Sequence, residues 1–264
     1  MKGGLLALLA VALVACSSDK PKPTPLTELK PTLAGRQVWS AQVGSIEFPL
    51  TVAVRDGRFF AAGSSGTVVA IEAETGRELW RAQAGAPLTA GVGSDGRAAA
   101  VVTRDNELVV LEDLRPRWKQ RLPARVVTPP LMAGERVFVL AVDRSVHAFD
   151  AQDGRRLWTY SRPGEALTLA QAGVLMAARN QLLVGQSGRL VALDAQKGSV
   201  NWDVPVGNSR GTNEVERLAD LVGPVVRQGD RVCVRSFQTA VGCVDIARPA
   251  PIWSRNAAGA TALG

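Results

Sequence analysis

The chain has 264 residues, a formal net charge of +7, 26 glycines and 15 prolines. This length is enough for one large β domain with a sizeable core, and the glycine and proline content is typical of a turn-rich all-β chain. The 31 basic residues are opposed by 24 acidic ones and form no run longer than two. We therefore expect no nucleic-acid partner, because spread charge seldom forms a stripe that follows phosphates.

Residues 1–15 are typical of a secretory signal peptide. Met1-Lys2 is followed by an apolar stretch that is too short to span a bilayer. The stretch ends in Leu13-Val14-Ala15-Cys16, which resembles a bacterial lipobox, the motif in which the cysteine is lipidated (palmitate included) and the signal is cut before it. The residue after Cys16 is Ser17 and not Asp. By resemblance to the lipoproteins that Gram-negative bacteria sort between their two membranes, this favours the outer membrane over the inner one. The alternative is an ordinary export signal with an incidental cysteine.

Residues 16–33 predict a tether between the lipid and a folded domain. The segment 17–25 is rich in proline and polar residues and has no hydrophobic periodicity. Such a composition is typical of an extended, disordered spacer. We assign residues 34–264 to a single β domain.

A repeated motif organises this domain. The pattern small–apolar–acid–Ala–x–x–Gly–x–x–x–Trp occurs at 70–80, 148–158 and 192–202. Alternation before the glycine predicts a strand, the glycine predicts a tight turn because it tolerates a positive φ, and the tryptophan supplies a large buried ring. All six tryptophans follow this rhythm of roughly 40 residues, which predicts the four-stranded antiparallel blades of a β-propeller. They are Trp39, Trp80, Trp118, Trp158, Trp202 and Trp253.

Five blades are expected, with the last turns of the second and fifth lacking the glycine. An outer strand at 36–41 precedes an inner strand at 48–54, which predicts ring closure, and 257–264 predicts the start of a sixth blade. We expect a C-terminally incomplete ring; the alternative is a closed five-blade ring in which 257–264 is a tail. The middle strand pairs are predicted at 58–62 with 67–72, 99–102 with 107–111, 137–141 with 146–150, 182–184 with 189–194, and 231–234 with 241–246.

Cys233 and Cys243 are predicted to form a disulfide. They lie symmetrically about Gln238, so a hairpin that turns at 237–239 would place them directly opposite each other, within disulfide range. An exported chain also reaches an oxidising compartment. The alternative is a pair of small buried residues.

No pattern indicates an active site. The single histidine, His147, lies within a predicted strand, and Asp150 and Asp194 fall at matching turn positions. We find no metal-ligand spacing, and no nucleophile elbow, phosphate loop or dinucleotide fingerprint. We therefore expect no catalysis, no metal site and no cofactor.

The motif is similar to the repeat of the quinoprotein (PQQ-type) propellers. That family includes periplasmic dehydrogenases with eight blades, PQQ and Ca²⁺. Those enzymes are much longer and carry an adjacent Cys-Cys pair, which this sequence lacks. A PQQ-dependent dehydrogenase relative or fragment is therefore one alternative function, and a propeller adaptor with another partner is a second.

The lipobox, tether and propeller together resemble the BamB family of lipoproteins of the outer-membrane β-barrel assembly (BAM) machinery. The most specific stretch is 214–220, Glu-Val-Glu-Arg-Leu-Ala-Asp, which resembles the family's Glu-x-(Asp/Glu)-Arg-Leu-x-Asp loop. The resemblance implies an eight-bladed ring and a non-catalytic scaffold that faces the periplasm from the outer membrane. Its implied partners are the POTRA domains of BamA, other BAM subunits and unfolded outer-membrane proteins.

The resemblance also implies which residues contact BamA. Leu167 and Leu169 match the Leu-x-Leu of one family loop, and Glu214, Arg217 and Asp220 belong to the second loop. Exposed leucines beside a charged loop would form a small apolar anchor with a polar rim. The alternative is that both leucines are the core of an inner strand, because alternation puts them on one face.

Two positions depart from the family pattern. Ala170 stands where the first loop usually has arginine, and Val222 stands where the second loop often has another acid. The resemblance therefore implies no charged contact from position 170.

Overall fold

The computed structural model describes residues 25, 35–162, 167–208, 212–214 and 218–257. The chain divides into two units, residues 1–37 and 38–264. The described residues of the first unit have no regular secondary structure, and Cys16 with the whole predicted signal lies outside the described part. No helix among the described residues is long and apolar enough to cross a membrane.

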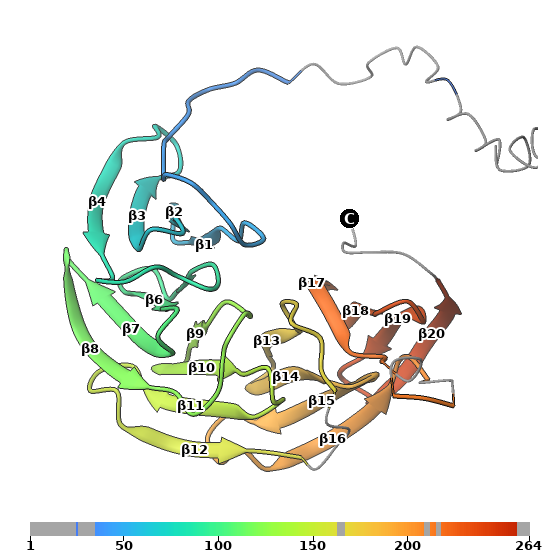
Figure 1. Cartoon of the computed structure of the whole chain (residues 1–264). Helices are drawn as coiled ribbons and strands as arrows, with labels where there is room; N and C mark the ends of the chain where they lie inside the picture. The colour runs from blue at the N-terminus through green and yellow to red at the C-terminus, as the bar shows by residue number, and fades with distance from the viewer. Residues whose placement is uncertain (1–24, 26–34, 163–166, 209–211, 215–217, 258–264) are drawn as a thin grey trace, which may run out of the picture. The chain divides into compact units, whose positions relative to one another are not determined.

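The second unit contains five four-stranded antiparallel sheets within the described residues, and in each sheet the strand order follows the chain. We number these sheets blades 1 to 5 (Figure 1). Their architecture confirms the predicted β-propeller blades. Blade 1 comprises β1 (Ala53–Arg55), β2 (Arg58–Ala62), β3 (Thr67–Glu72) and β4 (Glu78–Gln83); blade 2 comprises β5 (Gly93–Ser94), β6 (Ala99–Val102), β7 (Glu107–Glu112) and β8 (Arg115–Arg121); blade 3 comprises β9 (Leu131–Ala133), β10 (Arg136–Leu140), β11 (Val146–Asp150) and β12 (Arg156–Tyr160); blade 4 comprises β13 (Leu175–Ala178), β14 (Gln181–Gln186), β15 (Arg189–Asp194) and β16 (Val200–Pro205); blade 5 comprises β17 (Leu221–Gln228), β18 (Arg231–Ser236), β19 (Ala240–Asp245) and β20 (Ala250–Asn256).

The predicted middle strands agree with the structure to within two residues, but two other predicted strands do not. The inner strand expected at 48–54 is only β1 (Ala53–Arg55). Residues 48–50 have no partner on β2, because β2 ends at Ala62 in a register that pairs Ala53 with Phe60. The outer strand expected at 36–41 is not a strand, since none of the described sheets pairs with it. The predicted sixth blade falls on 257–264, of which only Ala257 is described.

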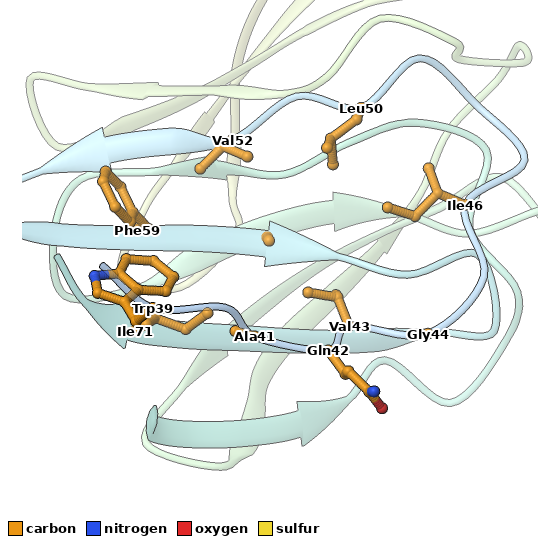
Figure 2. A pocket seen from close by; sticks show the side chains of 11 residues that line it. Trp39, Ala41, Gln42, Val43, Gly44, Ile46, Leu50, Val52, Phe59 and Ile71 are labelled. Carbon is orange, nitrogen blue, oxygen red and sulfur yellow. The ribbon is translucent and has the colours of Figure 1, made fainter. Parts of the chain in front are cut away.

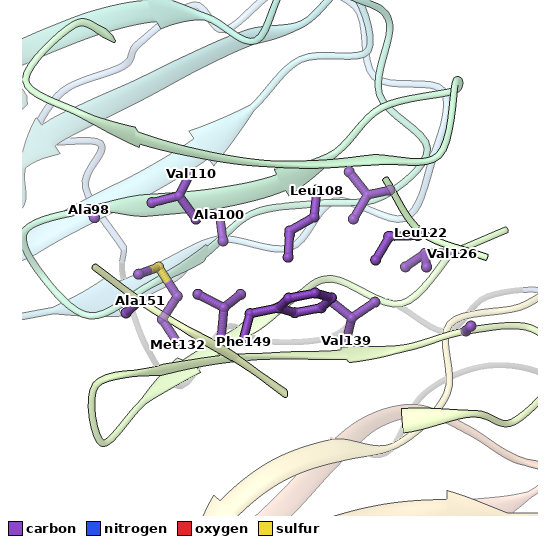
Figure 3. Close-up of a cluster of buried hydrophobic side chains, with 13 residues drawn as sticks. Ala98, Ala100, Leu108, Val110, Leu122, Val126, Met132, Val139, Phe149 and Ala151 are labelled. Carbon is purple, nitrogen blue, oxygen red and sulfur yellow. The ribbon is translucent and has the colours of Figure 1, made fainter. Parts of the chain in front are cut away.

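The hydrophobic core lies between successive blades. In β6, Ala100 and Val102 pack toward blade 3, whereas Ala99 and Val101 pack toward blade 1. Figure 3 shows the cluster between blades 2 and 3, in which Phe149 of blade 3 meets Leu108 of blade 2. Because both faces of a blade are covered, its middle strands are apolar at nearly every position instead of alternating.

The repeated motif joins blade 2 to blade 3 and blade 3 to blade 4. The Trp118 indole, on the last strand of blade 2, donates its Nε1–H to the Ala151 carbonyl of blade 3 at 3.0 Å. Gly154 has φ +74° and lies so close that a Cβ would be 2.6 Å from the Trp118 ring. The Trp118 indole is therefore half-buried against the turn of the following blade. Two further sets share this geometry: Trp39, Ala73 and Gly76, and Trp158, Ala195 and Gly198.

The two cysteines of blade 5 face each other across the β18–β19 hairpin. Cys233 pairs with Cys243 in the register of the two strands, and the residues form a disulfide with their Cα atoms 4.0 Å apart. The hairpin turns at Gln238, which has φ +52°. The pairing in the structure is thus the one that the spacing predicts.

Candidate partner-binding site

The structure brings part of the two predicted loops together. Leu167 and Leu169 precede β13 of blade 4, and Asp220 directly precedes β17 of blade 5. The backbone N–H of Leu169 donates to Asp220 Oδ2 at 3.1 Å. Both leucines lie outside the strands, and the Leu167 side chain is exposed. The inner-strand alternative is therefore wrong, and the first loop presents an apolar side chain to solvent.

The Asp220 carboxylate is largely covered. Its side chain is 14% exposed, and Oδ1 accepts hydrogen bonds from Arg144 Nε at 3.2 Å and Arg144 Nη2 at 3.1 Å. Because Oδ2 accepts from Leu169, both oxygens already have partners. Asp220 therefore holds the first loop in place and offers little free surface of its own.

Arg144 is a part of this site that the sequence analysis missed. It lies in the turn between β10 and β11 of blade 3, and its φ of +65° is unusual for a residue with a side chain. Its Nη2 also donates to the Leu167 carbonyl at 3.1 Å, and the Gln186 side-chain amide donates to the backbone carbonyl of Arg144 at 2.9 Å. Residues 144 and 220 are 76 positions apart, so no local motif could have connected them.

The remaining residues of the second loop are placed only in part. Glu214 is exposed, and Arg217 lies outside the described residues. Beside Arg144, Leu169 and Asp220 there is a cavity of about 40 Å³, close to the volume of a single water molecule. This cavity is therefore too small to hold a cofactor.

His147 belongs to a buried polar network that supports the Arg144 turn. Its Nε2 lies 2.9 Å from Ser145 Oγ and its Nδ1 lies 3.0 Å from Thr159 Oγ1. Ser145 Oγ donates to Asp143 Oδ1 at 2.6 Å. Burial lowers the pKa of His147, and the charge of Arg156 lowers it further. A neutral, hydrogen-bonded imidazole in this position has a structural role.

A second hollow, of about 550 Å³, lies beside Phe59 and Ile71, on the face of blade 1 that is turned away from blade 2. Figure 2 shows its lining, in which Trp39, Ile46, Leu50, Val52 and Phe59 surround the space. Apart from the half-buried Trp39 indole, the lining contains one polar side chain, that of Gln42. Such an apolar hollow offers no catalytic group, and the described residues contain no cluster of ligands for a metal ion.

Comparison with known proteins identifies the family. A family model described as outer membrane protein assembly factor BamB matches residues 27–89 and 65–263. The chain belongs to the BamB family. BamB of Burkholderia pseudomallei is 39% identical over 258 residues, which are 94% of this chain and 67% of the relative. BamB of Bordetella pertussis is 34% identical over 266 residues, which are 98% of this chain and 68% of the relative. The chain thus spans about two thirds of the length of these relatives.

Solved structures show the same fold. The crystal structure of BamB from Moraxella catarrhalis matches with a TM-score of 0.73 and 22% identity, covering 82% of this chain and 67% of that one. The quinohemoprotein alcohol dehydrogenase of Comamonas testosteroni matches with a TM-score of 0.58 and 15% identity, covering 82% of this chain and 44% of that one. The dehydrogenase is similar in fold alone, whereas relatives of the BamB family share sequence along nearly the whole chain.

Proposed function

We propose that this protein is a non-catalytic scaffold in the assembly of outer-membrane proteins. The observation that carries the proposal is the joining of two loops, far apart in sequence, by the largely buried Arg144–Asp220 pair, so that Leu167 faces solvent. The names of the relatives, outer membrane protein assembly factors, support the same role. A surface organised to display a side chain is typical of binding and needs no reacting groups.

The proposed partner is BamA, through its periplasmic POTRA domains, within a complex of BAM subunits. Leu167 and Leu169 would supply the apolar anchor, and Glu214 and Arg217 the charged rim that excludes water from it. Asp220 would act by holding the anchor loop. The clients of such a complex would be unfolded β-barrel proteins on their way into the outer membrane.

The proposed location is the periplasmic side of the outer membrane. Residues 1–15 would be removed, Cys16 would carry the lipid, and residues 16–33 would separate the lipid from the propeller domain. Lipidation with more than one acyl chain gives a stable anchor. Incorporation of labelled palmitate into the wild-type chain, and its loss in Cys16→Ala, would support this location; equal labelling of both would contradict it.

Co-purification from membranes tests the partner. Leu167→Ala/Leu169→Ala should lower recovery of BamA with the tagged chain about tenfold, because a truncated anchor typically costs that much in affinity. Val200→Ala is the matched control, since Val200 is also an exposed apolar side chain but lies on β16, outside the two loops. If wild type recovers no BamA, or if the control loses as much as the double variant, the proposal is wrong.

A further inference from the structure

We propose that Arg144 is a positioning residue for the partner-binding surface, acting from blade 3 on a loop of blade 4 and a carboxylate of blade 5. The inference rests on the proposed function, because it concerns how the same surface is held. The arginine that pairs with Asp220 thus comes from the β10–β11 turn. Position 170, in the leucine loop itself, is an alanine.

The side chain of Arg144 binds both loops at once. It is 12% exposed, and its guanidinium reaches Asp220 Oδ1 through Nε and Nη2 while Nη2 also donates to the Leu167 carbonyl. A planar guanidinium presents several N–H groups in a fixed fork, whereas lysine has a single nitrogen. Lysine could therefore retain the charge beside Asp220 without making all of these bonds.

The turn that carries Arg144 is itself fixed. Gln186, which is 2% exposed, donates its side-chain amide to the Arg144 carbonyl. The Ser145 backbone N–H donates to Asp143 Oδ1 at 2.9 Å, and the Val142 N–H donates to the Arg125 carbonyl at 2.9 Å. Arg144 is thus a fixed donor, with a backbone conformation held by blades 3 and 4.

The backbone around Asp220 is fixed from the other side. The Phe237 N–H donates to the Asp220 carbonyl at 2.9 Å, and the Leu221 N–H donates to the Ser187 carbonyl at 2.9 Å. The Ser236 hydroxyl also donates to the Ala219 carbonyl at 2.8 Å. Between these two fixed points, the segment 167–169 has no strand pairing and is held by the Leu167 carbonyl and the Leu169 N–H. Loss of Arg144 removes the first of these bonds and leaves the Asp220 charge covered without its cation.

The equivalent turn of blade 2 provides a natural control. Arg104 pairs with Glu47 at 3.4 Å, and their side chains are 63% and 68% exposed. An exposed pair of this kind contributes little, because water and salt screen it. Arg104 and Arg144 therefore differ in burial and in contact with the leucine loop, although both are arginines in the turn between the second and third strands of a blade.

Amide hydrogen exchange and BamA binding by the purified mature protein test the proposal together. Arg144→Met, which keeps an unbranched apolar stem, should speed exchange across 167–172 about tenfold, since exchange reports local opening. It should weaken BamA binding about tenfold, a typical coupling between sites. Arg104→Met should change neither quantity. Arg144→Lys should lie between wild type and Arg144→Met in both.

Three controls make the outcome decisive. Arg144→Met combined with Asp220→Asn should cost less than the sum of the two single changes, because both act through one contact. Additive effects, or unchanged exchange across 167–172 in a folded Arg144→Met, would overturn the proposal. If Arg144→Met does not fold, Arg144→Lys decides: wild-type exchange and wild-type affinity would overturn it. If wild type does not bind BamA, the proposed function falls, while the exchange data still decide whether Arg144 positions the loop.

Discussion

The turns that end the third strand of each blade fall into two kinds. Those of blades 1, 3 and 4 accept the indole N–H of a preceding tryptophan and pack its ring on a glycine, whereas those of blades 2 and 5 do neither within the described residues. This difference shows that the tryptophan and the glycine of the repeated motif make contacts between blades. A glycine and a tryptophan that are close in sequence, such as Gly154 and Trp158, serve two different interfaces.

Blade 5 shows which residue decides whether a turn accepts the indole of a preceding tryptophan. Asp245 accepts the N–H groups of Ala247 and Arg248, as Asp194 does for its own turn. Pro249, however, occupies the position of the glycine, and proline cannot adopt a φ near +74°. Trp202 of blade 4 instead donates to Gln181 Oε1 of its own blade at 2.9 Å.

Blade 2 replaces the whole turn. Asp113 and Leu114 have φ of +47° and +79° and form a two-residue connection between β7 and β8, typical of a type I′ hairpin. Such a turn has no glycine against which Trp80 could pack. Blades 1 and 2 are therefore joined by the hydrophobic cluster between them without an indole hydrogen bond in the described residues.

We call a tryptophan docked, and the turn that accepts its indole N–H a docked turn, where its ring packs on the glycine of that turn. The largest expected effect comes from filling the space beside a docked tryptophan. Gly154→Ala would put a Cβ 2.6 Å from the Trp118 ring at a φ of +74°, so we expect a loss of about 3 kcal/mol from overpacking and backbone strain. Gly134→Ala is the control, because Gly134 has φ +57° but open space around it, and should cost about 1 kcal/mol. Urea denaturation measures both; equal losses would mean that the ring contact contributes nothing.

The next effect comes from removing the indole N–H. Trp118→Phe leaves the Ala151 carbonyl without its partner, and we expect a loss of about 2 kcal/mol in the free energy of unfolding. Trp80→Phe should cost about 1 kcal/mol less, because the described residues offer the Trp80 indole no such acceptor. If thermal and urea unfolding give the same loss for both variants, the indole hydrogen bond to the turn does not contribute to the free energy of unfolding.

The sequence predicted the blades better than the site, and the reason is physical. Short apolar runs and the turn residues that bound them are local, so β2 (Arg58–Ala62) and β3 (Thr67–Glu72) could be assigned residue by residue, and the symmetry about Gln238 gave the register of the two cysteines. The partners of Trp118 and Asp220 lie on other blades, and nothing in the spacing indicates them. The leucine loop was identified by resemblance, whereas Arg144 has no counterpart in a local motif.

A smaller effect, of opposite sign, is expected where blade 2 departs from the motif. Leu114 is exposed and has φ +79°, a conformation that costs a non-glycine residue about 1–2 kcal/mol. Leu114→Gly creates the Asp-Gly pair that type I′ hairpins favour, and should stabilise the chain by about 1 kcal/mol. A rise in Tm of about 2–4 °C would be the expected sign; Gly76→Leu, the reverse change at a docked turn, should lower Tm. No rise for Leu114→Gly would show that this turn is not strained.

The smallest effect concerns the acid that begins a glycine turn. The backbone N–H groups of Lys197 and then Gln196 lower the pKa of Asp194 below its ordinary value of 3.8. A carboxyl whose pKa is lower in the folded state stabilises that state above the ordinary pKa, and this contribution is lost as the pH falls through the folded value. Asp194→Asn should therefore lower Tm slightly at pH 7, and this difference should shrink toward pH 2 as the Asp194 carboxyl becomes protonated. Asp245 and His147 remain in both chains, so their titration cancels in the comparison. An equal difference in Tm at both pH values would mean that the charge of Asp194 does not stabilise the turn.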